Sequence, residues 1–195
     1  MSRADHLLEL LAQSERLESL PRTGWLTCGI SPAESVASHV YHVALTAMWL
    51  ADAIEEDVDT AEVLRIALLH DLSEAVLTDI PAPAKKHIGA AHIREVESKL
   101  THEMITNMPN SWHRAVDQYF DQTTLESRLV KAADRIQMLA KSCQYRWQNR
   151  GNTDRFWTQS QRMEDVPPVV NEIIERLEDH FRSGTWYGRE GPTSE

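Results

Sequence analysis

Apolar residues recur along this chain every three or four positions, which is the spacing of one face of an α-helix. The longest of these stripes predicts a helix over residues 125–147, and a second long stripe predicts one over residues 34–54. No segment shows the alternation of apolar and polar residues that is typical of a half-buried strand. We therefore predict an all-α fold of six or seven helices. The other expected helices cover residues 4–20, 60–72, 92–108, 112–120 and 169–181.

Length and composition indicate one domain. A chain of 195 residues can bury one sizeable core, and 42% hydrophobic with 26% charged residues is typical of globular proteins. We expect the domain to span residues 1–182 and the polar segment 183–195 to be a mobile tail. We expect the segment 152–168 either to pack on the domain as a lid or brace or to help form a partner surface.

The charge of the chain restricts its partners. There are 20 Lys and Arg against 30 Asp and Glu, so the net charge is −10, which argues against duplex nucleic acid or an anionic membrane. A small anionic substrate remains compatible, because a metal and a few basic residues can reverse the sign locally. The chain shows no signal-peptide pattern and no apolar stretch of about 18 residues. With two cysteines read as reduced thiols, we expect a soluble, cytoplasmic protein.

Four ionisable residues lie where the helical pattern predicts buried surface. His39 lies in the helix over residues 34–54, and the pair His70-Asp71 ends the apolar run of the next helix. Asp134 lies on the apolar side of the longest helix. Burying such groups is costly unless they are paired or bound to a metal. Two imidazoles and two carboxylates on three buried helices therefore indicate a divalent-metal site.

Two choices at this site stay open. An ion pair with Arg65 or Arg135 is the alternative explanation for Asp134. The second choice is the metal, because nitrogen and oxygen ligands together suit Co²⁺, Mn²⁺, Fe²⁺, Ni²⁺ or Zn²⁺ better than Ca²⁺. Mg²⁺ is less natural with two imidazoles but is retained. His42 shares a helix face with His39, and only one of these two needs to be a ligand.

The chain resembles the HD-domain metal-dependent phosphohydrolases, and within them the 5'-deoxynucleotidase group. The resemblance rests on the order and approximate spacing of the four ionisable residues and on the sequence around them. It implies that His39, His70, Asp71 and Asp134 hold one divalent ion, and it suggests a homodimer. The stretches that carry it are Pro-Arg-Thr-Gly-Trp at 21–25, Glu-Ser-Val-Ala-Ser-His at 34–39, His-Asp-Leu-Ser-Glu-Ala-Val-Leu-Thr-Asp-Ile-Pro at 70–81 and Val-Lys-Ala-Ala-Asp at 130–134.

Two further acids are candidates for the chemistry near the metal, and a third is a candidate helix cap. Glu74 lies one helical turn after Asp71, so it can position a water molecule and move a proton, and the resemblance implies the same role. The resemblance also places Asp79 at the site, either protonating the leaving 5'-oxygen or holding a sugar hydroxyl. Glu34, with Ser35, opens the helix over residues 34–54, and we expect one of these two residues to cap it.

Basic and aromatic residues complete the expected site. Arg22 suits a phosphate because a guanidinium binds phosphate in a fork. Lys85, expected on the loop after Asp79, matches the place of a lysine in the family that the chain resembles. Trp25 has two interpretations, a wall for the sugar or base and a tryptophan of the core.

The expected activity is hydrolysis of deoxyribonucleoside 5'-monophosphates to deoxynucleoside and phosphate. Deoxynucleoside triphosphate triphosphohydrolases of the same superfamily share the four metal ligands and are the alternative. A non-catalytic nucleotide-binding module is less favoured, because Glu74 and the basic residues are all present. Guanosine tetraphosphate hydrolases usually carry an asparagine where this chain has Met138, which counts against that class.

Overall fold

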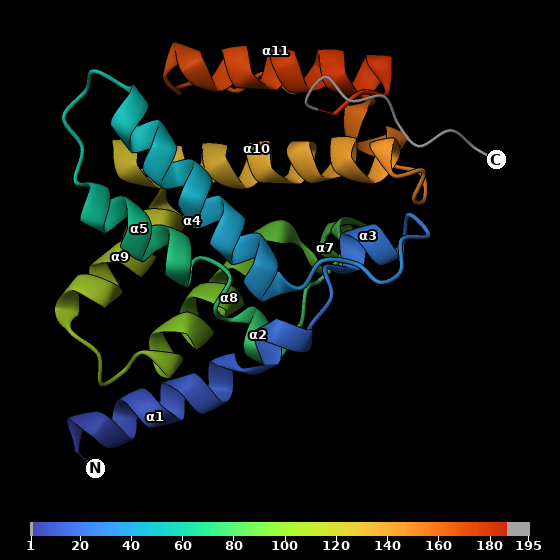
Figure 1. Cartoon of the computed structure of the whole chain (residues 1–195). Coiled ribbons are helices and arrows are strands. Elements are labelled where there is room, and N and C mark those ends of the chain that lie inside the picture. The colour runs from blue at the N-terminus through green and yellow to red at the C-terminus, as the bar shows by residue number, and fades with distance from the viewer. Residues whose placement is uncertain (1, 187–195) are drawn as a thin grey trace.

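The computed structural model describes residues 2–186, and this part of the chain is all-α (Figure 1). The predicted fold class is confirmed. The described part has eleven α-helical segments, more than the six or seven predicted, because three of them are four-residue turns of helix and α7 lies where a loop was expected. Of the expected tail at 183–195, residues 187–195 lie outside the described residues. The segments are α1 Arg3–Ser14, α2 Arg16–Ser19, α3 Thr23–Leu26, α4 Val36–Ala53, α5 Thr60–Leu69, α6 Glu74–Leu77, α7 Ala82–Ile88, α8 Ala90–Met104, α9 Asn110–Asp121, α10 Leu125–Trp147 and α11 Pro168–Ser183, with a 3₁₀ turn η1 at Asp154–Trp157.

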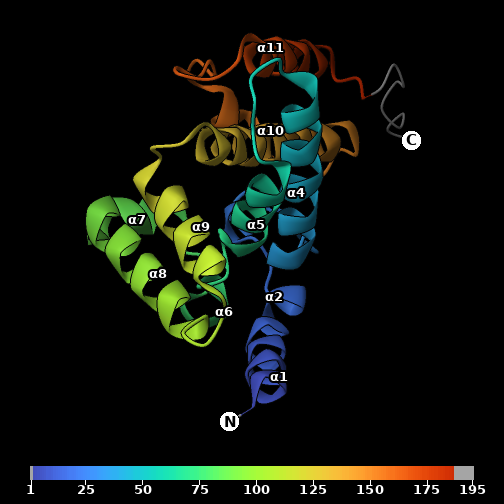
Figure 2. The same cartoon turned by 90° about the vertical axis from the view of Figure 1, so that its left-hand side faces the viewer.

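Helix α10 forms the centre of the core. It packs against α4, α5, α9 and α11, and Figure 1 shows α10 and α11 side by side with α4 crossing α10. Its apolar stripe is buried as the spacing predicts, with Leu129, Ala133 and Leu139 each 0% exposed. Figure 2 shows α7, α8 and α9 as a group beside this core, while α1 extends away from it at the N-terminal end.

Side-chain caps set the starts of the helices that carry the site. Ser35 accepts a hydrogen bond from the Ser38 amide at 3.1 Å and begins α4. Asp59 caps α5 by accepting from the Glu62 amide at 3.1 Å. Thr124 begins α10 in the same way. Each cap satisfies an amide that would otherwise lack a partner at the helix end.

The structure corrects two expected elements. The single helix expected over residues 4–20 is divided at Glu15 into α1 and α2. The loop expected after Asp79 is instead the start of α7, with Pro81 as its N-cap and Pro83 in its first turn. Proline is tolerated there because the first amides of a helix have no intrahelical acceptor. Lys85 therefore lies on a helix and not on a loop.

The segment 152–168 packs back on the domain and braces α10 against α11. The Trp157 ring stacks on Phe181 of α11 with 4.7 Å between centroids, and its indole N–H donates to Ser142 of α10 at 2.9 Å. Thr153 and Gln161 of this segment are buried. The brace thereby brings η1 beside the turn that contains Gly24, whose carbonyl accepts a hydrogen bond from Arg155 at 2.7 Å.

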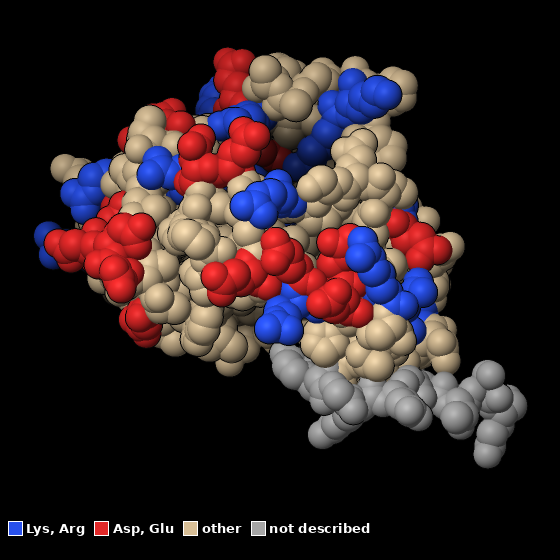
Figure 3. Space-filling model, turned by 90° about the horizontal axis from the view of Figure 1, so that it is seen from above, with Lys and Arg blue, Asp and Glu red and all other residues tan. Residues whose placement is uncertain are grey.

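On the face shown in Figure 3, acidic and basic side chains are interspersed, and this face carries no broad basic patch. Among the described residues, no helix is both long enough and apolar enough to cross a membrane.

Candidate active site

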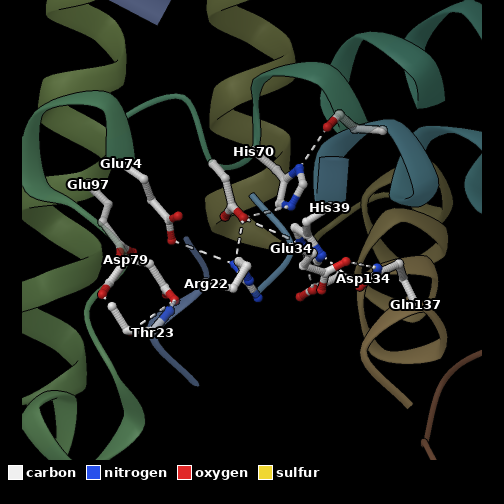
Figure 4. A network of polar contacts seen from close by, with 12 residues as sticks. Arg22, Thr23, Glu34, His39, His70, Glu74, Asp79, Glu97, Asp134 and Gln137 are labelled. Atoms are coloured by element: carbon white, nitrogen blue, oxygen red, sulfur yellow. Dashed lines mark hydrogen bonds and ion pairs between the residues drawn. The ribbon is translucent and has the colours of Figure 1, made fainter. Parts of the chain in front are cut away.

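Three helices and one turn bring the four predicted residues together (Figure 4). His39 lies one turn into α4, His70 and Asp71 follow α5, and Asp134 lies in the middle of α10. The ligand atoms of His39, His70 and Asp71 all lie within 4.8 Å of one another. The Oδ2 atom of Asp71 lies 3.2 Å from His70 Nε2 and 3.5 Å from His39 Nε2. The three residues could therefore hold one metal ion.

The hydrogen bonds of the two imidazoles direct both Nε2 atoms toward this centre. The Nδ1 atom of His70 lies 2.6 Å from the Ala67 carbonyl oxygen, and that of His39 lies 2.7 Å from Gln137 Oε1. Because both partner atoms only accept, each Nδ1 carries a proton, and Nε2 is the ring atom whose lone pair a metal ion could use. Both Nε2 atoms are buried without a hydrogen-bond partner. Lone pairs that face carboxylate oxygens fit a cation between them.

A buried polar network behind His39 fixes the orientation of its ring. Gln137 donates through Nε2 to Glu34 at 3.0 Å, which turns its Oε1 toward His39. Glu34 also accepts from the Trp25 indole at 2.8 Å, and its amide donates to the Tyr145 hydroxyl at 2.9 Å. Ser35, not Glu34, caps α4. The Glu34 carboxylate instead supports the imidazole through Gln137.

Asp134 approaches the centre from the side of His39. Its Oδ1 lies 3.4 Å from His39 Nε2, and its Oδ2 lies 3.4 Å from the Lys131 ammonium one turn earlier on α10. Burial opposes ionisation of Asp134, but Lys131 and His39 outweigh it and hold its pKa well below the usual value. Asp134 is therefore a charged carboxylate that faces the imidazoles.

Neither of the alternative partners considered for Asp134 forms an ion pair with it. Arg65 pairs with Glu62 on its own helix. Arg135 donates to the side-chain oxygen of Gln161. The cationic partner of Asp134 is Lys131, which the sequence analysis did not consider.

Arg22 lies directly over the acidic side of the centre. Its guanidinium donates to Asp71 Oδ2 at 3.0 Å and lies 3.8 Å from Glu74 Oε1. Burial disfavours both charges of the Arg22–Asp71 pair, but their attraction outweighs it. The pKa of Arg22 is therefore raised, and that of Asp71 is lowered, first by His70 and then by Arg22. A planar guanidinium in this place can receive a phosphate group.

Glu74 differs from the other acids at the site. It begins α6, is 5% exposed, and its Oε2 has no hydrogen-bond partner. Burial, followed by the negative charge of Asp71, raises the pKa of Glu74 to about 9. A carboxyl group with a raised pKa beside a candidate metal centre is suited to proton transfer.

Asp79 is held by Thr23. Its Oδ2 accepts from the Thr23 amide at 2.5 Å and from the Thr23 hydroxyl at 3.0 Å. The same hydroxyl lies 2.8 Å from the Asp79 carbonyl. These bonds tie the turn after α6 to α3 and leave Oδ1 as the atom available to another donor. This arrangement favours holding a sugar hydroxyl over protonating a leaving group.

A cleft of about 360 Å³ opens above these residues. Five acidic side chains and five cationic ones line it, in a protein whose net charge is −10. Lys85 is one of the cations, with its ammonium 3.2 Å from Glu97. Sequence reasoning identified Arg22 and Lys85, but it missed three cations and three aromatic rings of this wall. The missed residues are Arg94, Lys131, Arg155, Tyr119, Phe120 and Phe156.

Trp25 fits both interpretations that the sequence left open, a wall of the cleft and a tryptophan of the core. It borders the cleft, yet it is only 3% exposed and packs with Ile30 and Tyr145 in a small core of its own. Phe156 of η1 lies against it, with 4.8 Å between ring centroids. Phe156, which the sequence analysis did not single out, therefore extends the aromatic wall of the cleft.

A family model, two named relatives and a solved structure are similar to most of this chain. A family model described as "HD domain" matches residues 14–176. The chain is 33% identical over 156 residues to the protein named 5'-deoxynucleotidase YGK1 of Saccharomyces cerevisiae, covering 77% of this chain and 71% of the yeast protein. It is 28% identical over 144 residues to 5'-deoxynucleotidase HDDC2 of Bos taurus, covering 73% and 69%. A solved structure of a conserved hypothetical protein from Pyrococcus furiosus has a TM-score of 0.76 and 30% identity, covering 88% and 99%.

Proposed function

This chain belongs to the HD-domain family, and we propose that it hydrolyses deoxyribonucleoside 5'-monophosphates to deoxynucleoside and orthophosphate. The observation that carries the proposal is the pair of buried, unpartnered Nε2 atoms of His39 and His70 beside the Asp71 carboxylate. They lie under a cleft whose cationic side chains include Arg22, a guanidinium that suits a phosphate ester. The names of the yeast and bovine relatives support the deoxyribonucleotide as substrate.

The proposed metal ligands are His39, His70, Asp71 and Asp134. A divalent ion held by them would polarise the phosphoryl group and the attacking water. The two imidazoles favour Co²⁺, Mn²⁺, Fe²⁺, Ni²⁺ or Zn²⁺, and Mg²⁺ is retained as less natural. The orientation of both rings by Nδ1 hydrogen bonds supports this ligand set.

The other residues bind, orient and move protons. Arg22 and Lys85 would hold the phosphate oxygens, and Asp79 Oδ1 would accept a hydrogen bond from a sugar hydroxyl. The oxygen of water bonds to phosphorus while the carboxylate form of Glu74, which a cation bound at the centre would favour over the protonated form, accepts a proton from it. The bond between phosphorus and the 5'-oxygen breaks, and Glu74 returns the proton to that oxygen. Phe156 would face the sugar or base.

The experiment that tests this proposal measures orthophosphate released by chelator-treated protein after Co²⁺, Mn²⁺, Mg²⁺ or Zn²⁺ is restored. Substrates are deoxyribonucleoside monophosphates, ribonucleoside monophosphates and deoxyribonucleoside triphosphates. We expect metal-dependent orthophosphate and free nucleoside from the deoxy-monophosphates. Triphosphate released from the triphosphates would support the triphosphohydrolase alternative, and metal binding without any turnover would support the binding module.

Gln137 offers a test of the metal site that does not depend on turnover. Gln137→Met removes the acceptor of the His39 Nδ1–H bond at similar side-chain length. We expect metal affinity to fall about 10–100-fold, as is typical when the partner of a ligating histidine is lost. Competition with a chelating dye measures this. Gln148→Met, at the C-cap of the same helix, should bind metal as the parent does, and unchanged affinity in Gln137→Met would remove Gln137 from the site.

The expected homodimer stays a prediction. Three large apolar side chains follow the outer face of α4 at helical spacing, with Tyr41 63%, Leu45 48% and Trp49 51% exposed. An exposed apolar stripe of this kind is typical of a protein interface.

A further inference from the structure

A second cavity adjoins the cleft on the far side of Asp134. Its volume is about 390 Å³. The wall it shares with the cleft consists of Arg22, Lys131, Asp134 and Met138. Its outer wall is formed by Arg135 of α10 and by residues 160–163 of the brace. We call this second cavity the annex.

The annex is strongly basic. Four cationic side chains line it, and the only carboxylate among its described lining residues is Asp134. Three of the cations already have acidic partners: Arg22 pairs with Asp71, Lys131 with Asp134, and Arg162 with Glu175 at 3.5 Å. The fourth cation is Arg135.

Arg135 has no acidic partner. It is half-buried, and no carboxylate of residues 2–186 lies within 4.0 Å of its guanidinium nitrogens. Its hydrogen bond goes to the neutral amide oxygen of Gln161, a side chain only 6% exposed. A half-buried cation without a counter-ion is costly unless a ligand supplies the negative charge.

We infer that the annex binds a second phosphate group beside the one at the metal centre. A guanidinium fork matches phosphate oxygens, and the shared wall places this site next to Arg22 and Asp134. The group is either the orthophosphate that leaves after hydrolysis or the distal phosphate of a nucleoside diphosphate. The inference rests on the proposed function for its place beside a substrate phosphate, although the charge of the annex does not depend on it.

The first arm of the test compares thymidine 5'-monophosphate with thymidine 5'-diphosphate. Calorimetry on the metal-loaded Glu74→Gln protein gives both affinities without turnover. If the annex holds a distal phosphate, the diphosphate binds about tenfold more tightly, which is the gain expected of one charged hydrogen bond. Adding Arg135→Gln should remove this gain. Arg128→Gln, on the same helix and outside both cavities, should keep it.

The second arm titrates orthophosphate into the same protein saturated with the monophosphate. Binding that Arg135→Gln weakens about tenfold would identify the departing phosphate. Arg135→Lys keeps the charge without the fork and should retain part of the affinity. Circular dichroism checks that each variant folds. The inference is overturned if the diphosphate shows no gain and orthophosphate does not bind beside the monophosphate, or if either effect persists in Arg135→Gln.

The proposed hydrolysis of monophosphates and the proposed phosphate site in the annex can fail separately. If the monophosphates are not substrates, orthophosphate binding to metal-free, nucleotide-free protein still reports on the annex through its dependence on Arg135. If the monophosphates are hydrolysed but neither arm depends on Arg135, only the annex is disproved.

Discussion

Replacing Glu74 with alanine is expected to reduce hydrolysis of deoxyribonucleoside monophosphates by about 10²–10⁴-fold, the usual contribution of a general acid–base group. Its Oε2 is buried without a hydrogen-bond partner, so the carboxyl group is free to meet a water molecule. Metal content should not change, because Glu74 is outside the group formed by His39, His70 and Asp71. Steady-state kinetics with elemental analysis of the dialysed protein measure both quantities.

The control for Glu74→Ala is the same replacement at an acid that is exposed and not buried. Glu103 on α8 has a side chain 58% exposed and pairs only loosely with Lys99 at 3.9 Å, so Glu103→Ala should retain the parent rate. Glu74→Gln tests the same step without opening a cavity, since it keeps the shape and removes the proton acceptor. Turnover like that of the parent in either Glu74 variant would exclude Glu74 from the mechanism.

Helical periodicity was enough to locate the centre of the site. His39 and Asp134 interrupt apolar stripes whose other members are buried, and a charged group in such a position requires a partner. The helix expected over residues 60–72 ends instead at Leu69, so His70 and Asp71 lie in the turn that follows α5. Lys131 and Gln137 could also have been predicted from the sequence, since they lie three positions before and after the candidate ligand Asp134 on the same helix. A polar residue on a buried helix face was used as a signal for the ionisable residues but not for the uncharged Gln137.

Other parts of the site depend on contacts between distant segments. Glu34 is 103 positions from Gln137, and its sequence context indicates a helix cap equally well. Arg155 and Phe156 lie in a segment without periodicity, so nothing in the sequence predicted that the brace returns them to the cleft. Lys85 was predicted for the site but on a loop, because prolines usually interrupt helices and only their position in the first turn permits α7.

The strongest test of the proposed ligand set is the loss of one carboxylate. Asp134→Ala leaves His39 Nε2 facing only the Asp71 oxygen, and it also removes the ion pair with Lys131. We expect a metal affinity reduced by more than the roughly 10–100-fold typical of a residue that supports a ligand. Metal content after dialysis should fall, and turnover should fall with it. Asp117→Ala, whose side chain is 62% exposed on α9, should keep its metal.

Thermal unfolding separates a ligand from a residue that only pairs with Lys131. A metal that binds the folded state stabilises it by about 2.7 kcal/mol at a concentration of 100 times its Kd. The parent should gain this stability when metal is added, and Asp134→Ala should gain much less at the same concentration. Lys131→Met breaks the same ion pair but leaves the carboxylate, so it should retain the gain. Full metal occupancy in Asp134→Ala, or equal loss of the gain in both variants, would show that Asp134 acts through Lys131 and not as a metal ligand.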